Sequence, residues 1–229
     1  MAPLILGMGN PLLDISATVD TAMLDKYSLK ANDAILYEKE DLYDEMLANH
    51  KVDYIAGGAT QNSIRVAQWL LEKPQSVAYF GCVGKSTLTF EIFNTFENSL
   101  FLFLLGTDKS CETLEKVANE AGVLVKYQKS TEHPTGKCAV LITGQDRSLV
   151  TKLDAANHFT TAHLDVAENW ALVESAKIFY SAGFFLTVCP DAMLKVAQHA
   201  QASNKNFCMN LSAPFLCEFF KNPMLKVST

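Results

Sequence analysis

Short apolar runs alternate with amphipathic stretches along most of the chain, and this alternation predicts the fold class. The runs "LILGMG", "SVAYFGCVG" and "IFYSAG" have the length and composition of buried strands, and a glycine ends each of them. The stretch "TQNSIRVAQWLL" instead repeats its apolar residues at helical spacing. Strands that alternate with helices form a mostly parallel sheet covered by those helices, so we expect an α/β fold.

Later stretches refine this prediction. "CETLEKVANEAG", "HLDVAENWALVESAK" and "PDAMLKVAQHAQASN" each predict one helix; the first ends at a glycine and the third begins at a proline. Between them, "KCAVLITG" and "SLVTKL" predict two strands joined by a turn at "QDR". We expect this ribbon to form a smaller β-rich piece beside the main sheet.

The composition limits the partners and the location. The 229 residues carry 19 basic and 25 acidic side chains, without a basic cluster that would follow a phosphate backbone, so we expect no nucleic-acid partner. The six cysteines form no CxxC pair and the histidines show no ligand spacing, which favours reduced thiols, a cytoplasmic or nuclear location and no metal-ligand set. The opening "MAPLILGMGNPLLD" lacks the basic n-region of a signal peptide, so we interpret it as a strand and expect no membrane partner.

Ligands of open parallel sheets bind at the carboxyl ends of the strands, so the residues after each predicted strand are candidates for a site. Asp14 follows the first strand, where its carboxylate would accept hydrogen bonds from a sugar diol or would serve as a turn or cap residue. Gly57 and Gly58 precede a helix whose first turn holds Asn62, an arrangement that suits hydroxyl or phosphate recognition and is also found in ordinary turns. Aromatic rings at strand ends would stack on a flat base or belong to the core: Phe184, Phe185 and Phe215.

Five stretches together resemble one family. "GMGNPLLDIS", "AGGATQNSIRVAQWL", "PTGKCAVLITGQDRSLV", "AGFFLTV" and "NLSAPF" resemble the adenosine kinase branch of the ribokinase-like (PfkB) carbohydrate kinases. The resemblance implies a large α/β domain with a small β-rich lid, and phosphoryl transfer from ATP with Mg²⁺ to the 5′-hydroxyl of adenosine, giving AMP in purine salvage. It also implies a monomer in the complete family protein.

The resemblance assigns roles position by position. Asp14 would hold the ribose hydroxyls with Gly58 and Asn62, and Arg147 would lie near the phosphates, where a guanidinium suits developing charge. The remaining substrate-binding residues would line the ribose pocket or wall the base: Asn10, Leu12, Leu36, Gly57, Cys138, Leu149, Phe184 and Phe215. Three positions depart from the family, which usually has Gln, Ser and Ala there: Ala34, Ala59 and Thr151. We expect these departures to adjust the contacts with the base without abolishing them.

Two sequence motifs with which the resembled family performs catalysis are missing from this sequence. The family uses a glycine-rich Asp-Thr-x-Gly-Ala-Gly-Asp stretch as anion hole and base, yet no glycine follows Gly183 in this chain, and the Asn-x-x-Glu element associated with magnesium is absent too. We therefore expect an incomplete ribokinase-like domain over 1–229 that lacks the C-terminal part of the fold, has no catalytic residue and is inactive. A non-catalytic nucleoside-binding or regulatory fragment, and a PfkB-type kinase of another nucleoside or sugar, are the alternatives.

The stretch from Gly81 to Ser110 contains Gly-Lys-Ser-Thr and an apolar "LFLFLL" run. A phosphate-binding P-loop requires a second glycine five positions before Gly84, where Tyr79 stands, and polar residues interrupt any membrane span. Removing 85–106 yields "FGCVGTDKSCETL", which continues the family pattern without a gap. We therefore interpret 85–106 as an insertion, either a translated intron or a real loop, between lid segments that we expect at about 15–55 and 123–155.

Overall fold

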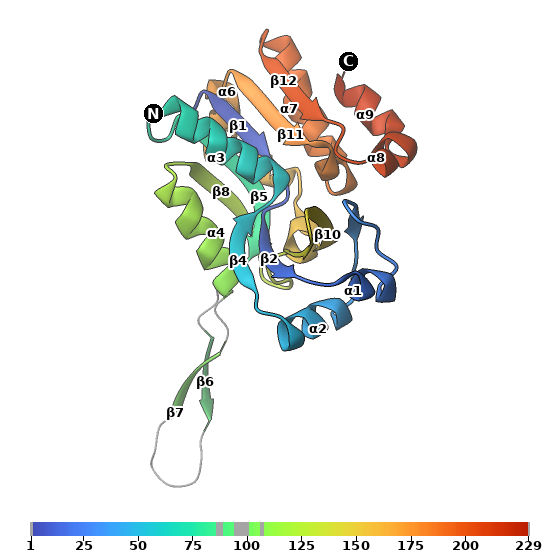
Figure 1. The fold of residues 1–229 in the computed structure, drawn as a ribbon. Coiled ribbons are helices and arrows are strands. Elements are labelled where there is room, and N and C mark those ends of the chain that lie inside the picture. Colours follow the sequence, from blue (N-terminus) through green and yellow to red (C-terminus); the bar gives the residue numbers. More distant parts are fainter. Residues whose placement is uncertain (1, 86–88, 94–100, 106–107, 229) are drawn as a thin grey trace.

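A computed structural model describes residues 2–85, 89–93, 101–105 and 108–228, the side chains of the two short middle ranges and of residue 228 excepted (Figure 1). Five parallel strands form the large sheet in the order β12-β11-β1-β5-β8. Their bounds are β1 (Ile5–Met8), β5 (Val77–Gly84), β8 (Leu124–Ser130), β11 (Ile178–Ala182) and β12 (Asn206–Asn210). The predicted α/β class with a mostly parallel sheet is confirmed.

Helices cover both faces of the large sheet, which explains why all eight residues of β5 are buried. Tyr79 and its neighbours on one face pack in one cluster with residues of α3 (Ala59–Leu71) and α4 (Lys109–Glu120). On the other face, Phe80 and Phe179 share a cluster with residues of α7 (Pro190–Ala202) and α6 (Ala167–Ser175). A strand buried on both faces needs an apolar residue at every position and not at alternate ones, as "VAYFGCV" has.

The predicted single helix at "HLDVAENWALVESAK" is wrong. The structure has two helices there, α5 (Ala162–Asp165) and α6, because Val166 adopts an extended conformation with ψ of 123°. Short helical elements and the C-terminal helices complete this layer: η1 (Asp154–His158), η2 (Gly183–Thr187), α8 (Pro214–Phe219) and α9 (Lys221–Ser228).

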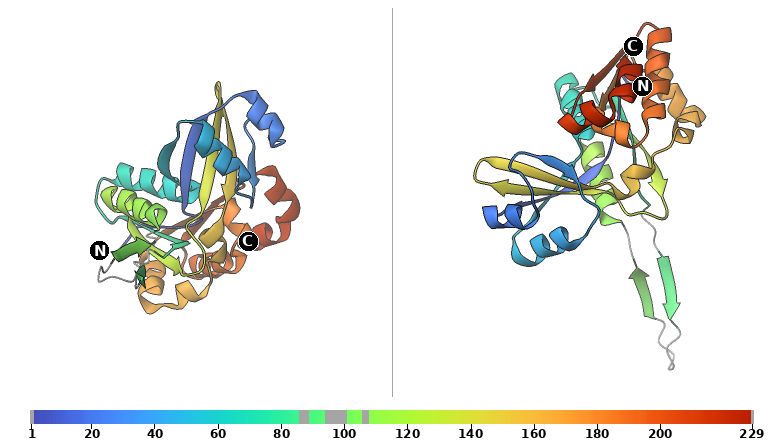
Figure 2. Two further views of the ribbon diagram at one scale, coloured as in Figure 1. Left: turned by 90° about the horizontal axis from the view of Figure 1, so that it is seen from below. Right: turned by 90° about the vertical axis from the view of Figure 1, so that its right-hand side faces the viewer.

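A second five-stranded sheet, which we call the lid sheet, has the order β3-β10-β9-β2-β4 and lies beside the carboxyl ends of the large sheet (Figure 2). Its strands are β2 (Leu12–Thr18), β3 (Ala34–Leu36), β4 (Asp53–Gly57), β9 (Lys137–Thr143) and β10 (Asp146–Lys152). The helices α1 (Thr21–Lys26) and α2 (Asp41–Asn49) contribute Leu24 and Tyr43 to the core on one of its faces. The other face remains available to form a wall of a site.

The lid sheet differs in extent from the lid segments expected from the sequence. β8 falls within the expected segment 123–155, but it pairs with β5 and lies in the large sheet. The β9–β10 hairpin is present, and its turn uses Gly144 at φ +64°, which glycine adopts without strain. The lid strands therefore come from 12–57 and 137–152.

Much of the expected insertion at 85–106 lies outside the described residues. Its two described strands, β6 (Thr89–Phe93) and β7 (Phe101–Leu105), pair antiparallel in a sheet of their own that projects away from both other sheets (Figure 1). The residues that flank this segment meet at Thr135, whose hydroxyl accepts from the Gly84 N–H at 3.0 Å and donates to the Asp108 carboxylate at 2.8 Å. In the described part of the chain, no helix has the length and apolar character to cross a membrane.

Candidate functional site

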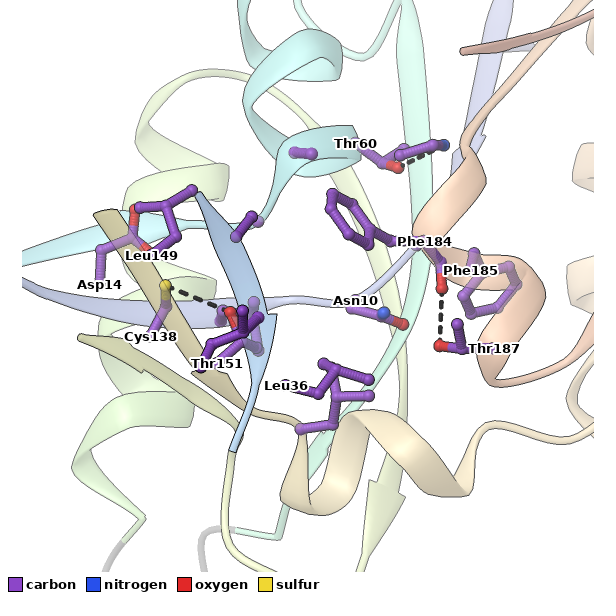
Figure 3. A pocket seen from close by; sticks show the side chains of 18 of the residues that line it. Asn10, Asp14, Leu36, Thr60, Cys138, Leu149, Thr151, Phe184, Phe185 and Thr187 are labelled. Atoms are coloured by element: carbon purple, nitrogen blue, oxygen red, sulfur yellow. Dashed lines mark hydrogen bonds between the residues drawn. The ribbon is translucent and has the colours of Figure 1, made fainter. Parts of the chain in front are cut away.

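A cavity of about 260 Å³ lies between the lid sheet and the carboxyl ends of the large sheet (Figure 3). The lid sheet forms one wall, and the ends of β1 and β11 with the start of α3 form the other. The lining residues are Gly9, Asn10, Leu12, Asp14, Ala34, Ile35, Leu36, Gly58, Ala59, Thr60, Asn62, Cys138, Arg147, Leu149, Thr151, Leu153, Ala182, Phe184, Phe185, Thr187 and Phe215.

Four residues in register across four strands form the lid wall, and we call them the lid row. Leu36 on β3 pairs with Thr151 on β10, Thr151 with Cys138 on β9, and Cys138 with Asp14 on β2. Residues opposite one another in a sheet point to the same face. The lid row therefore runs along one face from the apolar side chain of Leu36, past Thr151 and Cys138, to the carboxylate of Asp14. Arg147 and Leu149 reach the cavity at the two-residue period of β10.

Asp14 lies within β2, so its interpretation as a turn or cap residue is wrong. Burial raises the pKa of its carboxyl to about 6, and the positive charge of Arg147 opposes part of that rise. The Arg147 Nη2 lies 3.8 Å from Asp14 Oδ2, the only ion pair of this carboxylate among the described residues. Gly57 on the neighbouring strand lets β4 pass the carboxylate, since a Cβ there would lie 2.1 Å from Asp14 Oδ1.

The start of α3 offers hydrogen-bond donors to the cavity. Gly58 precedes the helix at φ +96°, and no side chain caps this end, so the first N–H groups have no partner of that kind. A Cβ at Gly58 would lie 2.4 Å from the Asn10 carbonyl oxygen, so only glycine fits here. Asn62 lies one turn into the helix and lines the same cavity. These groups suit hydroxyl or phosphate oxygens.

Asn10 supplies a further polar group. Its Oδ1 is buried and has no hydrogen-bond partner within the described part of the chain. A buried acceptor without a partner costs free energy, and a ligand hydroxyl or amine would satisfy it. The cavity therefore combines a carboxylate, an amide oxygen and helix N–H groups, and we call the part that they line its polar end.

Aromatic side chains form the wall opposite the lid row. Phe184, in η2, faces the lid row across the cavity in Figure 3, and its ring centroid is 6.3 Å from that of Phe215. Ser212 supports it by accepting a hydrogen bond from the Phe184 N–H at 3.1 Å. Phe215 lies in the first turn of α8, not at a strand end as the sequence suggested. Phe185 is fully buried against Phe159 in the core.

The structure brings nearly all of the predicted binding residues together. Gly57 does not line the cavity and acts on it by making room for Asp14. Residues that sequence reasoning missed include Leu153, which continues the two-residue period of Leu149 and Thr151. It also missed the hydroxyl of Thr60, which accepts from the Ala182 N–H at 3.0 Å and so joins α3 to the end of β11.

The described residues contain no group of three or more His, Cys, Asp or Glu side chains that would hold a metal ion. The donor set around the cavity is one carboxylate beside a guanidinium, which does not fit the several oxygen ligands of Mg²⁺. The polar end therefore fits the hydroxyls of a ligand better than a cation.

Several curated proteins are similar to this chain. An adenosine kinase of Arabidopsis thaliana is 51% identical over 221 residues, which are 96% of this chain and 58% of that protein. The adenosine kinase of Saccharomyces cerevisiae is 45% identical over 99% of this chain and 61% of its own length. The chain thus spans about three fifths of the length of these relatives.

Solved structures agree with this similarity. Anopheles gambiae adenosine kinase in complex with P1,P4-di(adenosine-5) tetraphosphate superposes with a TM-score of 0.86 and 42% identity, over 99% of this chain and 62% of that one. Schistosoma mansoni adenosine kinase in complex with adenosine has a TM-score of 0.83 and 34% identity, over 98% and 59%. The model of the pfkB family carbohydrate kinases matches residues 21–99 and 92–228. Since these matches cover most of the chain, it belongs to the pfkB family of carbohydrate kinases.

Proposed function

We propose that this chain binds adenosine in the cavity, as the acceptor-binding part of an adenosine kinase that phosphorylates the 5′-hydroxyl with ATP to give AMP. The observation that carries the proposal is the lid row, which places one carboxylate and an apolar wall on the same face of one sheet. A nucleoside has the matching order, a diol at one end and a flat apolar ring at the other. The similarity to adenosine kinases supports the choice of adenosine among nucleosides.

The polar end of the cavity would hold the ribose. The Asp14 carboxylate accepts hydrogen bonds from both ribose hydroxyls, which is the geometry that a diol offers to two carboxylate oxygens. The N–H groups after Gly58 and the side chain of Asn62 receive the hydroxyl oxygens from the α3 side. Asn10 Oδ1, buried without a partner among the described residues, accepts from a further hydroxyl.

The apolar end would hold the base. Phe184 stacks on one face of the ring, and Leu36 and Leu149 cover the other from the lid sheet. Leu12, Cys138 and Phe215 close the edges.

Phosphoryl transfer would need more than these residues supply. Arg147 is the group of the cavity that suits developing phosphate charge, and it is already close to Asp14. No glycine-rich anion hole follows Gly183, and the residues present do not fit Mg²⁺. We therefore propose that the 229-residue chain binds adenosine and forms little or no AMP, which makes a non-catalytic binding role the second candidate for these residues.

Isothermal titration calorimetry of the whole chain with adenosine tests binding, and a parallel assay of AMP formation with ATP and Mg²⁺ tests catalysis. We expect saturable binding that Asp14→Asn abolishes, and no AMP. Formation of AMP by the chain would contradict the proposed lack of catalysis but would agree with the proposed binding of adenosine. Binding of a free sugar or of a different nucleoside in preference to adenosine would instead favour a PfkB-type kinase with another substrate.

A further inference from the structure

Thr151 places a hydroxyl in the middle of an otherwise apolar stretch of the lid wall. Within the lid row it lies between Leu36 and Cys138; Leu149 precedes it on the same face of β10, and Leu153, just after the strand, also lines the cavity. Asp14 is two strands away in the same row, so the backbones that carry the two polar groups are about 9.5 Å apart. That separation matches the length of a nucleoside from its diol to the far edge of its base.

A short hydrogen-bond chain sets the direction of the Thr151 hydroxyl. Thr151 Oγ1 donates to Cys138 Sγ at 3.3 Å (Figure 3), and the Cys138 thiol donates to the Ala139 carbonyl oxygen at 3.7 Å. Burial and the nearby Asp14 charge raise the pKa of the Cys138 thiol to about 12, which keeps the thiol proton in place for that donation. In this arrangement the Thr151 hydroxyl donates its hydrogen to sulfur, and the lone pairs of Oγ1 can accept from a ligand.

The surroundings make this acceptor selective. A base atom that reaches Thr151 leaves water behind and meets leucine side chains on either side, so an unmatched polar group there costs free energy. If the substituent of the base at this point is an amino group, its N–H donates to Oγ1. A carbonyl oxygen there would face Oγ1 with a second acceptor, and a base without a substituent would leave Oγ1 without a partner. Sites that hydrogen-bond a substrate group discriminate in this way against analogues that lack it.

We propose that Thr151 is a specificity-determining residue, whose Oγ1 accepts a hydrogen bond from the exocyclic amino group of the base and so selects 6-aminopurine nucleosides over 6-oxo and unsubstituted ones. This inference rests on the proposed nucleoside binding, and it adds the residue and atom that read the base. Leu36 and Leu149 give the same wall its shape, whereas Thr151 distinguishes between bases that carry different substituents.

The test is a set of dissociation constants for adenosine, purine riboside and inosine, measured by calorimetry on the whole chain and on three variants. Thr151→Val removes the hydroxyl and retains the shape, and Thr151→Ser retains the hydroxyl. Thr113→Val, on the surface of α4, is the control, since its hydroxyl donates to the Lys109 carbonyl remote from the cavity. Melting temperatures establish that each variant is folded.

We expect the unaltered chain to prefer adenosine to purine riboside by about three- to tenfold, the size of one uncharged hydrogen bond. Thr151→Val should remove this preference by weakening adenosine alone, while Thr151→Ser and Thr113→Val retain it. An equal loss for all three ligands in Thr151→Val would show a packing role and overturn the inference, and so would an unaltered chain without the preference, or a loss confined to inosine. Those outcomes leave nucleoside binding in place, whereas failure of every nucleoside to bind overturns the proposed function as well.

Discussion

Asp14 lowers the stability of the folded protein, because its carboxylate is buried and has one cationic neighbour among the described residues, Arg147 at 3.8 Å. Its side chain is only 13% exposed, and Gly57 on the neighbouring strand leaves room for its oxygens. A ligand with two hydroxyls would replace the solvent that the carboxylate has lost. The proposed binding of a diol would therefore recover free energy that the free protein loses by burying this carboxylate.

Asp14→Asn should stabilise the free protein at neutral pH and abolish adenosine binding. The folded pKa of about 6 lies above the usual 3.8, so the protonated form is favoured by folding and the contribution to stability is lost as the pH rises from about 4 through about 6. The neutral amide avoids this cost, and we expect the free energy of unfolding to rise by about 1 to 3 kcal/mol. Urea denaturation without nucleoside at about pH 8 measures it. A less stable Asp14→Asn protein would contradict the prediction.

The affinity for adenosine should fall in acid because the ribose contacts need the ionised carboxylate. We expect the dissociation constant to be constant above about pH 7 and to rise below about pH 6, approaching tenfold per pH unit. Arg147→Ala should move this midpoint to higher pH, since Arg147 lowers the pKa of Asp14. Calorimetry across this range checks both statements, and a pH-independent affinity would mean that Asp14 does not contact the ligand.

At the scale of elements, the approach of β4 to β2 and the start of α3 shape the polar end of the cavity. Sequence patterns predicted α3 and the strands β1, β5 and β11 of the large sheet, because these carry clear helical spacing or continuous apolar runs. They did not predict β2 as a separate strand around Asp14, although its residues alternate between a buried apolar face and a polar face that carries Asp14. β3 was missed as well, because three residues are too short to show a period.

Gly57→Ala should weaken adenosine binding by at least about tenfold with the fold retained, because the new Cβ would displace the Asp14 carboxylate by contact at 2.1 Å. Gly144→Ala is a suitable control. Its Cβ would meet nothing within 4 Å, but its φ of +64° penalises any side chain, so we expect a loss of about 1 kcal/mol in stability with unchanged affinity. Calorimetry and denaturation of both variants separate the two effects. Equal affinity in Gly57→Ala and the unaltered chain would contradict the account.

At the scale of the whole molecule, the cavity joins two sheets whose strands come from distant parts of the chain. The lid row draws on residues 14, 36, 138 and 151, and no local pattern in the sequence indicates that these lie side by side. The resemblance to a family supplied what periodicity did not. It left unresolved the split between α5 and α6 and the place of β8, which depend on packing and pairing with β5.

Removing 85–106 should leave the rest of the protein folded. Gly84 and Asp108 both form hydrogen bonds with Thr135, so the described residues on either side of the segment lie close together and the deletion has a short gap to close. We expect an equal or higher melting temperature and an adenosine affinity within about twofold, because long loops add little to stability. Differential scanning calorimetry and titration of the deletion variant measure these quantities. Loss of cooperative unfolding would show that the segment is an integral part of the fold.

The parallel pairing of β2 with β9 also has a consequence for the order of folding. β2 acquires this partner only after more than a hundred further residues have been synthesised, and contacts of such separation form late and slowly. A nucleoside that touches Asp14 and Thr151 together would bridge this joint and resist its opening. A bound nucleoside would then slow the separation of β2 from the β9–β10 hairpin and so lengthen the lifetime of the folded state.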